Sequence, residues 1–173
     1  MKSINILHDH YMKARYGLME WAGCSKWAVN CLVENEENND DEIILLAGSE
    51  SDGEMKSLTE IILQRYLPSI NRNDEYWAGK YIVELHRLYI NKRIDIFDIE
   101  NIINNLYYKL GYPDWLVMLA RNCEYATDVP AFQKPFEEEF SYIKGLWSSS
   151  ESIDMFNKSY ERQVSNSHDF KSC

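Results

Sequence analysis

The chain of 173 residues carries 18 Lys and Arg against 28 Asp and Glu, which gives a formal net charge of −10. Its length fits one domain, and 45% hydrophobic residues suffice for a core, which excludes wholesale disorder. The acidic balance disfavours nucleic acid as a partner, because gripping phosphates requires clustered Lys and Arg. We therefore predict a single helical domain over 1–173 whose charged partner would be basic.

No segment is typical of a membrane protein or of an exported one. The longest apolar run, Trp115–Ala120, has six residues, whereas a helix needs about 20 to cross a bilayer. Residues 1–10 contain neither the apolar stretch nor the small-residue cleavage site of an export signal. The sequence thus predicts a cytoplasmic protein with no membrane partner.

Periodic apolar residues predict helices through most of the chain. Small and apolar side chains recur every three or four residues from Tyr11 to Cys31 and predict a helix over about 5–34. Gly17 and Gly23 weaken this helix, and whether it bends or splits near Gly23 is left open. Caps and periodicity predict further helices at residues 41–47, 53–67, 74–91, 95–110 and 135–147, with a buried apolar segment at 115–123.

The predicted fold class is all-α, a compact bundle of about six to seven helices. Similar helix lengths leave a stack of helix pairs as the alternative. Residues 124–134 are expected to be irregular, and the tail to form one or two weak turns around Ile153 and Phe156. Residues after about 160 are expected to be frayed. The core should contain Trp21, Leu85 and Leu106 as nearly inaccessible side chains.

No motif for catalysis, a metal or a cofactor is present. The four cysteines show no CxxC spacing, and the four histidines form no HExxH motif or i, i+4 pair. Gly-rich phosphate-binding patterns are also absent. We therefore expect no enzyme activity, no metal, no cofactor, and reduced structural thiols.

Carboxylates form three clusters along the chain, over 34–42, at residues 50 to 54, and at Glu137–Glu139. The first lacks the alternating ligands and central Gly of a calcium loop, and a solvated loop is its simpler interpretation. The sharper hypothesis is an electronegative surface that steers a basic partner. Because the first two clusters flank the same short helix, they are expected to form one continuous patch. The acidic residues at the start of the helix over 135–147 are instead explained by the helix dipole.

Aromatic residues suggest possible interface anchors. Five Trp and twelve Tyr exceed what a helical core needs, and such residues often anchor interfaces. The adjacent Tyr107 and Tyr108 cannot both face the core, nor can Tyr76 and Trp77. Tyr76 and Tyr108 are therefore candidate anchors, although ordinary partly buried aromatics would explain them as well.

Two stretches of sequence resemble a group of small, acidic, helical bacterial proteins of uncharacterised function. The first is a helix with spaced Ala and Trp, a polar loop, and the run Leu45, Leu46, Ala47 and Gly48 before Glu54 opens the next helix. The second leads from a helix containing Tyr81 to Leu88, through Ile94–Ile96, to a helix closed by the residues 110–114. Such proteins are similar to immunity proteins of toxin systems, including contact-dependent growth inhibition. The resemblance covers about residues 10–125 and implies binding to a toxin domain, with no catalytic residues.

We therefore expect an immunity protein that binds and neutralises a cognate toxin domain, such as a basic nuclease, by occlusion. A helical adaptor or scaffold of unknown partner is the alternative, followed by an enzyme with an unrecognised site. The predicted binding residues are Glu34, Glu36, Glu37, Asp40, Asp41, Glu50, Asp52 and Glu54, with Tyr76 or Tyr108 as the anchor.

Overall fold

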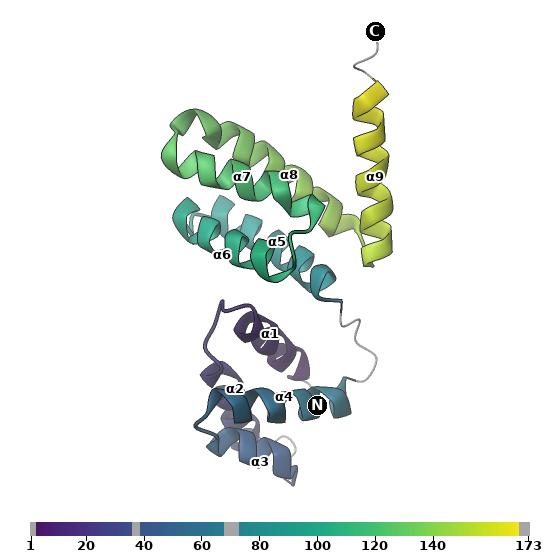
Figure 1. Ribbon diagram of the computed structural model, residues 1–173. Helices are drawn as coiled ribbons and strands as arrows, with labels where there is room; N and C mark the ends of the chain where they lie inside the picture. The colour runs from purple at the N-terminus through teal and green to yellow at the C-terminus, as the bar shows by residue number, and fades with distance from the viewer. Residues whose placement is uncertain (1–2, 36–38, 68–72, 170–173) are drawn as a thin grey trace. The chain divides into compact units, whose positions relative to one another are not determined.

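The computed structural model describes residues 3–35, 39–67 and 73–169, with 162–169 described by their backbone alone (Figure 1). Over these ranges the chain forms helices and no strand, which confirms the all-α prediction. Its contacts divide it into two compact units, residues 1–70 and 71–173, and each is described by itself. The single domain over 1–173 stays a prediction.

The first unit consists of four helices around one apolar cluster. They are α1 (Ile4–Arg15), α2 (Ala22–Val33), α3 (Asp41–Gly48) and α4 (Asp52–Tyr66). The cluster takes side chains from every helix, among them Leu7 from α1, Trp27 from α2, Leu46 from α3 and Ile62 from α4. Helix α3 packs against both α2 and α4, as its place in Figure 1 shows. A helix as short as α3 is not stable in isolation, so its packing against two longer helices stabilises it.

The predicted helix over 5–34 is two helices, and the break lies at Gly17. There the backbone has φ +72°, the Gly17 N–H donates to Ala14 O over 3.0 Å, and the Leu18 N–H donates to Lys13 O over 2.8 Å. This pair of hydrogen bonds is a Schellman motif, which needs a left-handed residue that glycine adopts without steric cost. Gly23 instead lies in the first turn of α2.

The second unit packs α5 to α8 against one another, with α9 along the end of α8 (Figure 1). Its elements are α5 (Asp74–Ile90), α6 (Ile96–Lys109), α7 (Asp114–Asp128), the 3-10 turn η1 (Pro130–Phe132), α8 (Gln133–Ser149) and α9 (Ile153–Asp169). Trp147 of α8 lies fully buried in this unit and stacks on Phe156 of α9, with 3.7 Å between ring centroids. Trp115 meets Trp147 edge-on at 5.1 Å. This aromatic cluster joins α9 to the other helices of the unit.

Nine α-helices are present over the described ranges, so the prediction of six to seven was too low. One extra helix comes from the split at Gly17. The other is α9, a helix from Ile153 to Asp169 with Phe156 fully buried, where the sequence predicts only one or two weak turns. Helix α7 also extends through Asp128 into the segment expected to be irregular. The fraying expected after about residue 160 stays a prediction.

The predicted core residues are largely correct. Leu85 and Leu106 are 1% and 0% exposed, whereas Trp21 is only partly buried. Trp21 lies at the N-cap of α2, where its ring packs edge-on against Tyr11 with centroids 5.7 Å apart. A residue at a helix end has fewer neighbours to cover it, which explains the difference.

Candidate functional site

The acidic charge of the protein is concentrated in one part of the first unit. Residues 34–54 contain nine Asp and Glu and no Lys or Arg. They extend from the end of α2, through α3, to the first turn of α4. This segment contains all eight carboxylates that the sequence predicts as partner-binding, and it is the candidate functional site.

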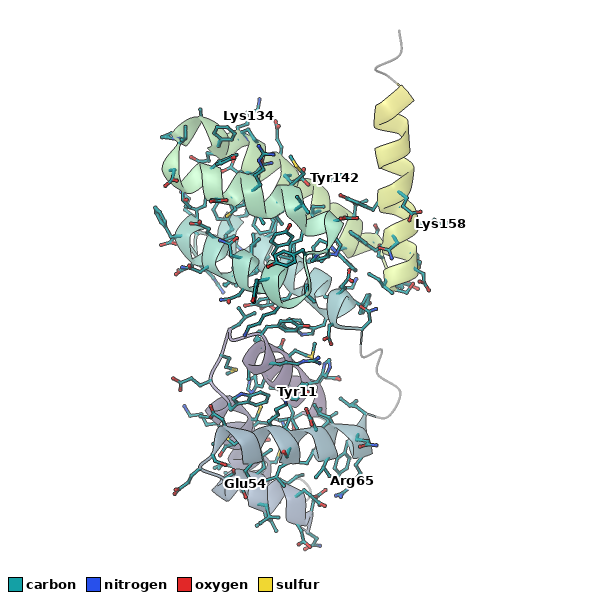
Figure 2. All side chains as sticks on the ribbon, in the orientation of Figure 1. Tyr11, Glu54, Arg65, Lys134, Tyr142 and Lys158 are labelled. Atoms are coloured by element: carbon teal, nitrogen blue, oxygen red, sulfur yellow. The ribbon has the colours of Figure 1, made fainter. Side chains whose placement is uncertain are left out.

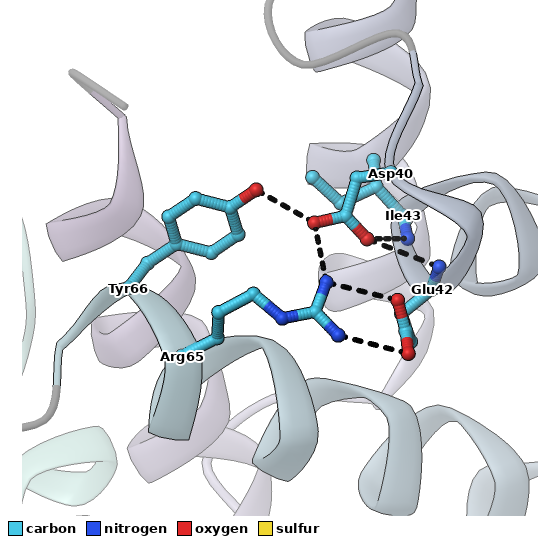
Figure 3. Close-up of polar contacts among 5 residues, drawn as sticks. All are labelled: Asp40, Glu42, Ile43, Arg65 and Tyr66. Carbon is cyan, nitrogen blue, oxygen red and sulfur yellow. Dashed lines mark hydrogen bonds and ion pairs between the residues drawn. The ribbon is translucent and has the colours of Figure 1, made fainter.

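Asp40 lies at the centre of a hydrogen-bond cluster at the start of α3 (Figure 3). Its Oδ1 accepts from the backbone N–H groups of Glu42 and Ile43, at 3.1 and 3.4 Å, and thereby caps α3. Its Oδ2 accepts from Arg65 Nη1 at 2.8 Å and from the Tyr66 hydroxyl at 2.6 Å. Burial raises the pKa of this carboxyl, but the four hydrogen bonds outweigh it and hold the pKa below its ordinary value.

Asp40 therefore differs from the solvated carboxylate that the sequence predicts. It is 8% exposed and its charge is matched by Arg65, so it fastens α3 to the end of α4. Arg65 also pairs with Glu42, with Nη2 2.9 Å from Oε1. Hydrogen bonds to Glu42 and Asp40 raise the pKa of the Arg65 guanidinium. Two of the nine carboxylates thus share one internal cation, and the three groups together keep one net negative charge.

The other described carboxylates of the segment face solvent. Glu54 accepts a hydrogen bond from the Ser49 hydroxyl at 2.9 Å, and its backbone N–H is capped by Ser51. The exposed residues are Glu34, Asp41, Glu50, Asp52 and Glu54. Glu36 and Glu37 lie outside the described residues.

These carboxylates form two groups at opposite ends of α3, where the sequence predicts one continuous patch. Asp41 opens α3, whereas Glu50 follows its end. Eight helical residues separate the ends by about 12 Å. Glu54 and Arg65 likewise lie toward opposite ends of α4 (Figure 2). The length of α3 exceeds the Debye length of about 8 Å at physiological salt, so each group acts as its own center of charge.

The two predicted aromatic anchors lie in the second unit and differ in exposure. Tyr76 is partly buried, with its ring edge-on to Trp147 at 6.3 Å and Lys80 Nζ 5.3 Å from its centroid. Tyr108 is 68% exposed and touches Tyr112 with centroids 5.8 Å apart. Tyr76 therefore contributes to packing, and Tyr108 is the residue whose ring is available to a partner.

The buried thiols are poor nucleophiles. Burial raises the pKa of Cys24 to about 11, against a smaller opposing effect of Thr59. Burial, with a smaller contribution from Glu100, raises the pKa of Cys123 to about 12. The thiolate is the reactive form of cysteine, and a raised pKa disfavours it. A catalytic cysteine instead needs an electropositive setting, which neither residue has.

A histidine and a serine approach each other on the second unit. His86 Nε2 of α5 lies 3.1 Å from Ser141 Oγ of α8, and the His86 ring packs edge-on against Phe140 at 5.0 Å. Burial and then Lys144 lower the pKa of His86. Ser141 lies inside a helix, where backbone N–H groups are already bonded and cannot form an oxyanion hole. The contact is therefore explained by packing between α5 and α8.

A hollow with a volume of about 680 Å³ lies at one end of the second unit. Its wall includes Tyr89, Lys92, Arg93, Asp95 and Glu137, and contains no Ser, Cys or His. The Tyr89 hydroxyl donates to Glu137 at 3.0 Å. With both signs of charge and no pairing of nucleophile and base, this wall favours no particular reaction.

Among the described residues, no three His, Cys, Asp or Glu side chains come together as metal ligands would. None of the helices in the described ranges has both the length and the apolar character needed to cross a membrane. The chain matches no family model, no curated protein and no solved structure. Its own charges and geometry therefore carry the functional argument.

Two residues of the acidic site were not found from the sequence. Neither Arg65 nor Tyr66 is among the predicted binding residues, yet both bind Asp40. The available signal for this pairing is a cation near the end of one helix, α4, after the acidic first turn of the preceding helix, α3. Such a pattern cannot specify the partner, because 25 residues separate Arg65 from Asp40.

Proposed function

We propose that the protein is an immunity protein that binds a basic toxin domain and blocks it by occlusion. The observation that carries this proposal is the acidic segment 34–54, in which two carboxylates pair with Arg65 and five described ones face solvent. The same proposal assigns no catalytic role to the chain. It includes neither nucleic acid nor membrane as a partner.

A basic domain is the partner that such a surface favours physically. An enzyme that acts on nucleic acid must itself present Lys and Arg to bind phosphates. An acidic protein is drawn to that same surface, and long-range attraction raises the association rate. A protein bound there excludes the substrate, so inhibition needs no chemistry.

A helical adaptor is the second candidate, and the second unit favours it. Its exposed large side chains include Phe97 at 58% and Tyr108 at 68%. Such residues suit contacts with further proteins. An adaptor would use the surface of the second unit, whereas the proposed immunity function would use the acidic surface of the first.

The decisive experiment is protection of a sensitive host by co-expression. The candidate toxin is the product encoded immediately upstream of this chain in its native genome; it is induced with and without the protein, and growth is measured. The proposal predicts full growth with the protein and arrest without it. Absence of protection by a folded, expressed protein would contradict the immunity function.

Charge reversal then tests the acidic site with purified toxin domain. The variant Glu34→Lys, Asp41→Lys and Glu50→Lys should slow association roughly tenfold at low salt and weaken its salt dependence. Its matched control, with the same change in net charge, reverses three exposed carboxylates of the second unit: Glu124, Asp128 and Glu138. Equal slowing in both variants would show that net charge alone attracts the toxin and that the acidic site has no special role.

A further inference from the structure

Four exposed aliphatic side chains lie on the outer surface of α2 and α3, between the two acidic groups. They are Val29, Val33, Ile44 and Leu45, and they are between 42% and 75% exposed. The core sides of both helices are filled by other residues, such as Ala28 and Leu46, which are fully buried. These four therefore contribute little to the core of the first unit.

One hydrogen bond fixes how α2 and α3 lie against each other. The Ser25 hydroxyl near the start of α2 donates to Ala47 O near the end of α3, at 3.3 Å, so the two helices run antiparallel. With a rise of about 1.5 Å per residue in both helices, Val29 and Ile44 come within about 1.5 Å of the same level. Each residue lies about 100° around its helix from a residue directed at the core, Ala28 and Ile43 respectively.

Seen along one direction, the rotation from each residue to the next is clockwise in one of two antiparallel helices and anticlockwise in the other. Val29 and Ile44 therefore converge above the line where α2 meets α3. Val33 follows one turn further along α2, and Leu45 lies a further 100° around α3 from Ile44, on the side away from α2. We call these four exposed residues the α2–α3 seam.

Carboxylates border the α2–α3 seam at both ends. Glu34 follows Val33 directly, and Asp41 lies one turn before Ile44 on the same helix. Glu50 lies just past the end of α3. The sequence of the two helices contains a single cation, Lys26. An apolar centre with charged surroundings is the usual composition of a protein interface.

We propose that the α2–α3 seam is the docking site for a protein segment whose apolar side chains are flanked by Lys or Arg. The proposal rests on the proposed function and specifies where and how the partner binds. Aliphatic contact along the seam sets the lifetime of the complex, and the carboxylates at its ends attract the cations during encounter. This assignment replaces Tyr76 and Tyr108 as anchors.

A second copy of the chain is the less suitable occupant. A symmetric dimer places the same surface on both sides of the interface. It would bring Glu34, Asp41 and Glu50 of one copy close to the same residues of the other. Repulsion between like charges opposes that arrangement, whereas a basic segment would neutralise them.

The test uses a synthetic helical peptide of Lys and Leu, with Leu every three or four residues and Lys elsewhere, and its analogue with Ser in place of Leu. Binding of labelled peptide to the full chain is measured by fluorescence anisotropy at about 150 mM salt. The variant Ile44→Gln with Leu45→Gln keeps residues that favour helix. It should weaken binding of the Leu peptide roughly tenfold and leave weak binding of the Ser analogue unchanged.

The matched control is Phe97→Gln in the second unit, because Phe97 is exposed to nearly the same degree as Leu45, 58% against 55%. It should bind the Leu peptide as the wild type does. Equal weakening by Phe97→Gln, or unchanged binding by the seam variant, would overturn the proposal. A wild-type dimer in light scattering that the seam variant abolishes would overturn it as well, in favour of a second copy.

The outcomes separate this proposal from the proposed function. If the seam variant binds the peptide weakly but the wild type gives no protection against the toxin, the seam stands and the immunity function fails. If the wild type protects and the seam variant protects equally at limiting expression, the immunity function stands and the seam is wrong. Circular dichroism of each variant confirms that it is folded.

Discussion

Gly79 of α5 is the position where one added methyl group should do most damage. A Cβ built there would overlap the atoms Cδ2, Cε2 and Cε3 of the Trp147 ring. These are atoms of a rigid ring, and the ring is held by Phe156 on one side and Trp115 at its edge. Trp147 therefore cannot yield by a simple rotation, and Gly79→Ala should destabilise the second unit.

The expected size follows from two opposing effects. Alanine favours an α-helix over glycine by about 1 kcal/mol. Overpacking of a tight core costs about 1–3 kcal/mol, and expulsion of a buried Trp about 3–5 kcal/mol. The net loss of unfolding free energy should therefore be up to about 2 kcal/mol if Trp147 shifts and about 2–4 kcal/mol if it leaves.

Gly145→Ala in α8 supplies the control. A Cβ at Gly145 meets no atom within 4 Å, and the residue is exposed in the interior of its helix. Only the gain in helix propensity remains, so this variant should be more stable than the wild type by up to about 1 kcal/mol. The same substitution thus has opposite signs at two positions of one unit.

Urea unfolding followed by far-ultraviolet circular dichroism measures both effects. Near-ultraviolet circular dichroism adds a probe of the aromatic cluster, whose signal should fall in Gly79→Ala. A Gly79→Ala variant as stable as Gly145→Ala would show that the Trp147 ring has room to move, and the packing described here would be wrong.

The acidic cap, the buried thiols and the core of α6 supply further tests. Asp40→Asn keeps a capping oxygen but loses the charge. Because the pKa of Asp40 is lowered on folding, the wild type should have the larger unfolding free energy. This advantage should be full above the unfolded pKa of about 3.9 and lost as pH falls through the folded pKa. Urea unfolding at about pH 2 to 7 measures it, and an advantage that grows on acidification would contradict the assignment. Cys24 and Cys123 should react with iodoacetamide at least roughly a hundredfold more slowly in the native protein than in urea, as mass spectrometry of each peptide would show. Leu106→Ala should lower the unfolding free energy by about 2–5 kcal/mol, and a neutral effect would place Leu106 outside the core.

Features set by neighbouring residues could be predicted from the sequence. The caps are the clearest case, since a side chain three residues upstream bonds the backbone. Asn73 Oδ1 accepts from the Tyr76 N–H and Asp95 Oδ1 from the Asp98 N–H, both at 2.9 Å. Gly111, with φ +78°, closes α6 as its place after Leu110 indicates. Helix type and most helix ends are therefore encoded within a few residues.

Features set by distant residues could not be predicted. Apolar periodicity assigns Ile61 and Arg65 to the core stripe of α4, yet Ile61 is 44% exposed and Thr59 is fully buried. Which face of a helix is buried depends on the helices that pack beside it. Where apolar residues lie on two faces of a helix, the sequence alone does not show which face is buried. The acidic site shows the same limit, because local composition locates its carboxylates but does not reveal that Arg65 pairs with two of them.

The concentration of charge in 34–54 itself supports a role in binding. Like charges close together repel one another and lower the stability of the folded state. If the carboxylates served solubility alone, dispersal over the surface would serve it equally well with less repulsion. The first unit instead keeps exposed carboxylates at both ends of α3, with the exposed aliphatic seam between them. Both features cost stability or solubility when the protein is alone, and a basic, apolar-centred partner relieves both at once.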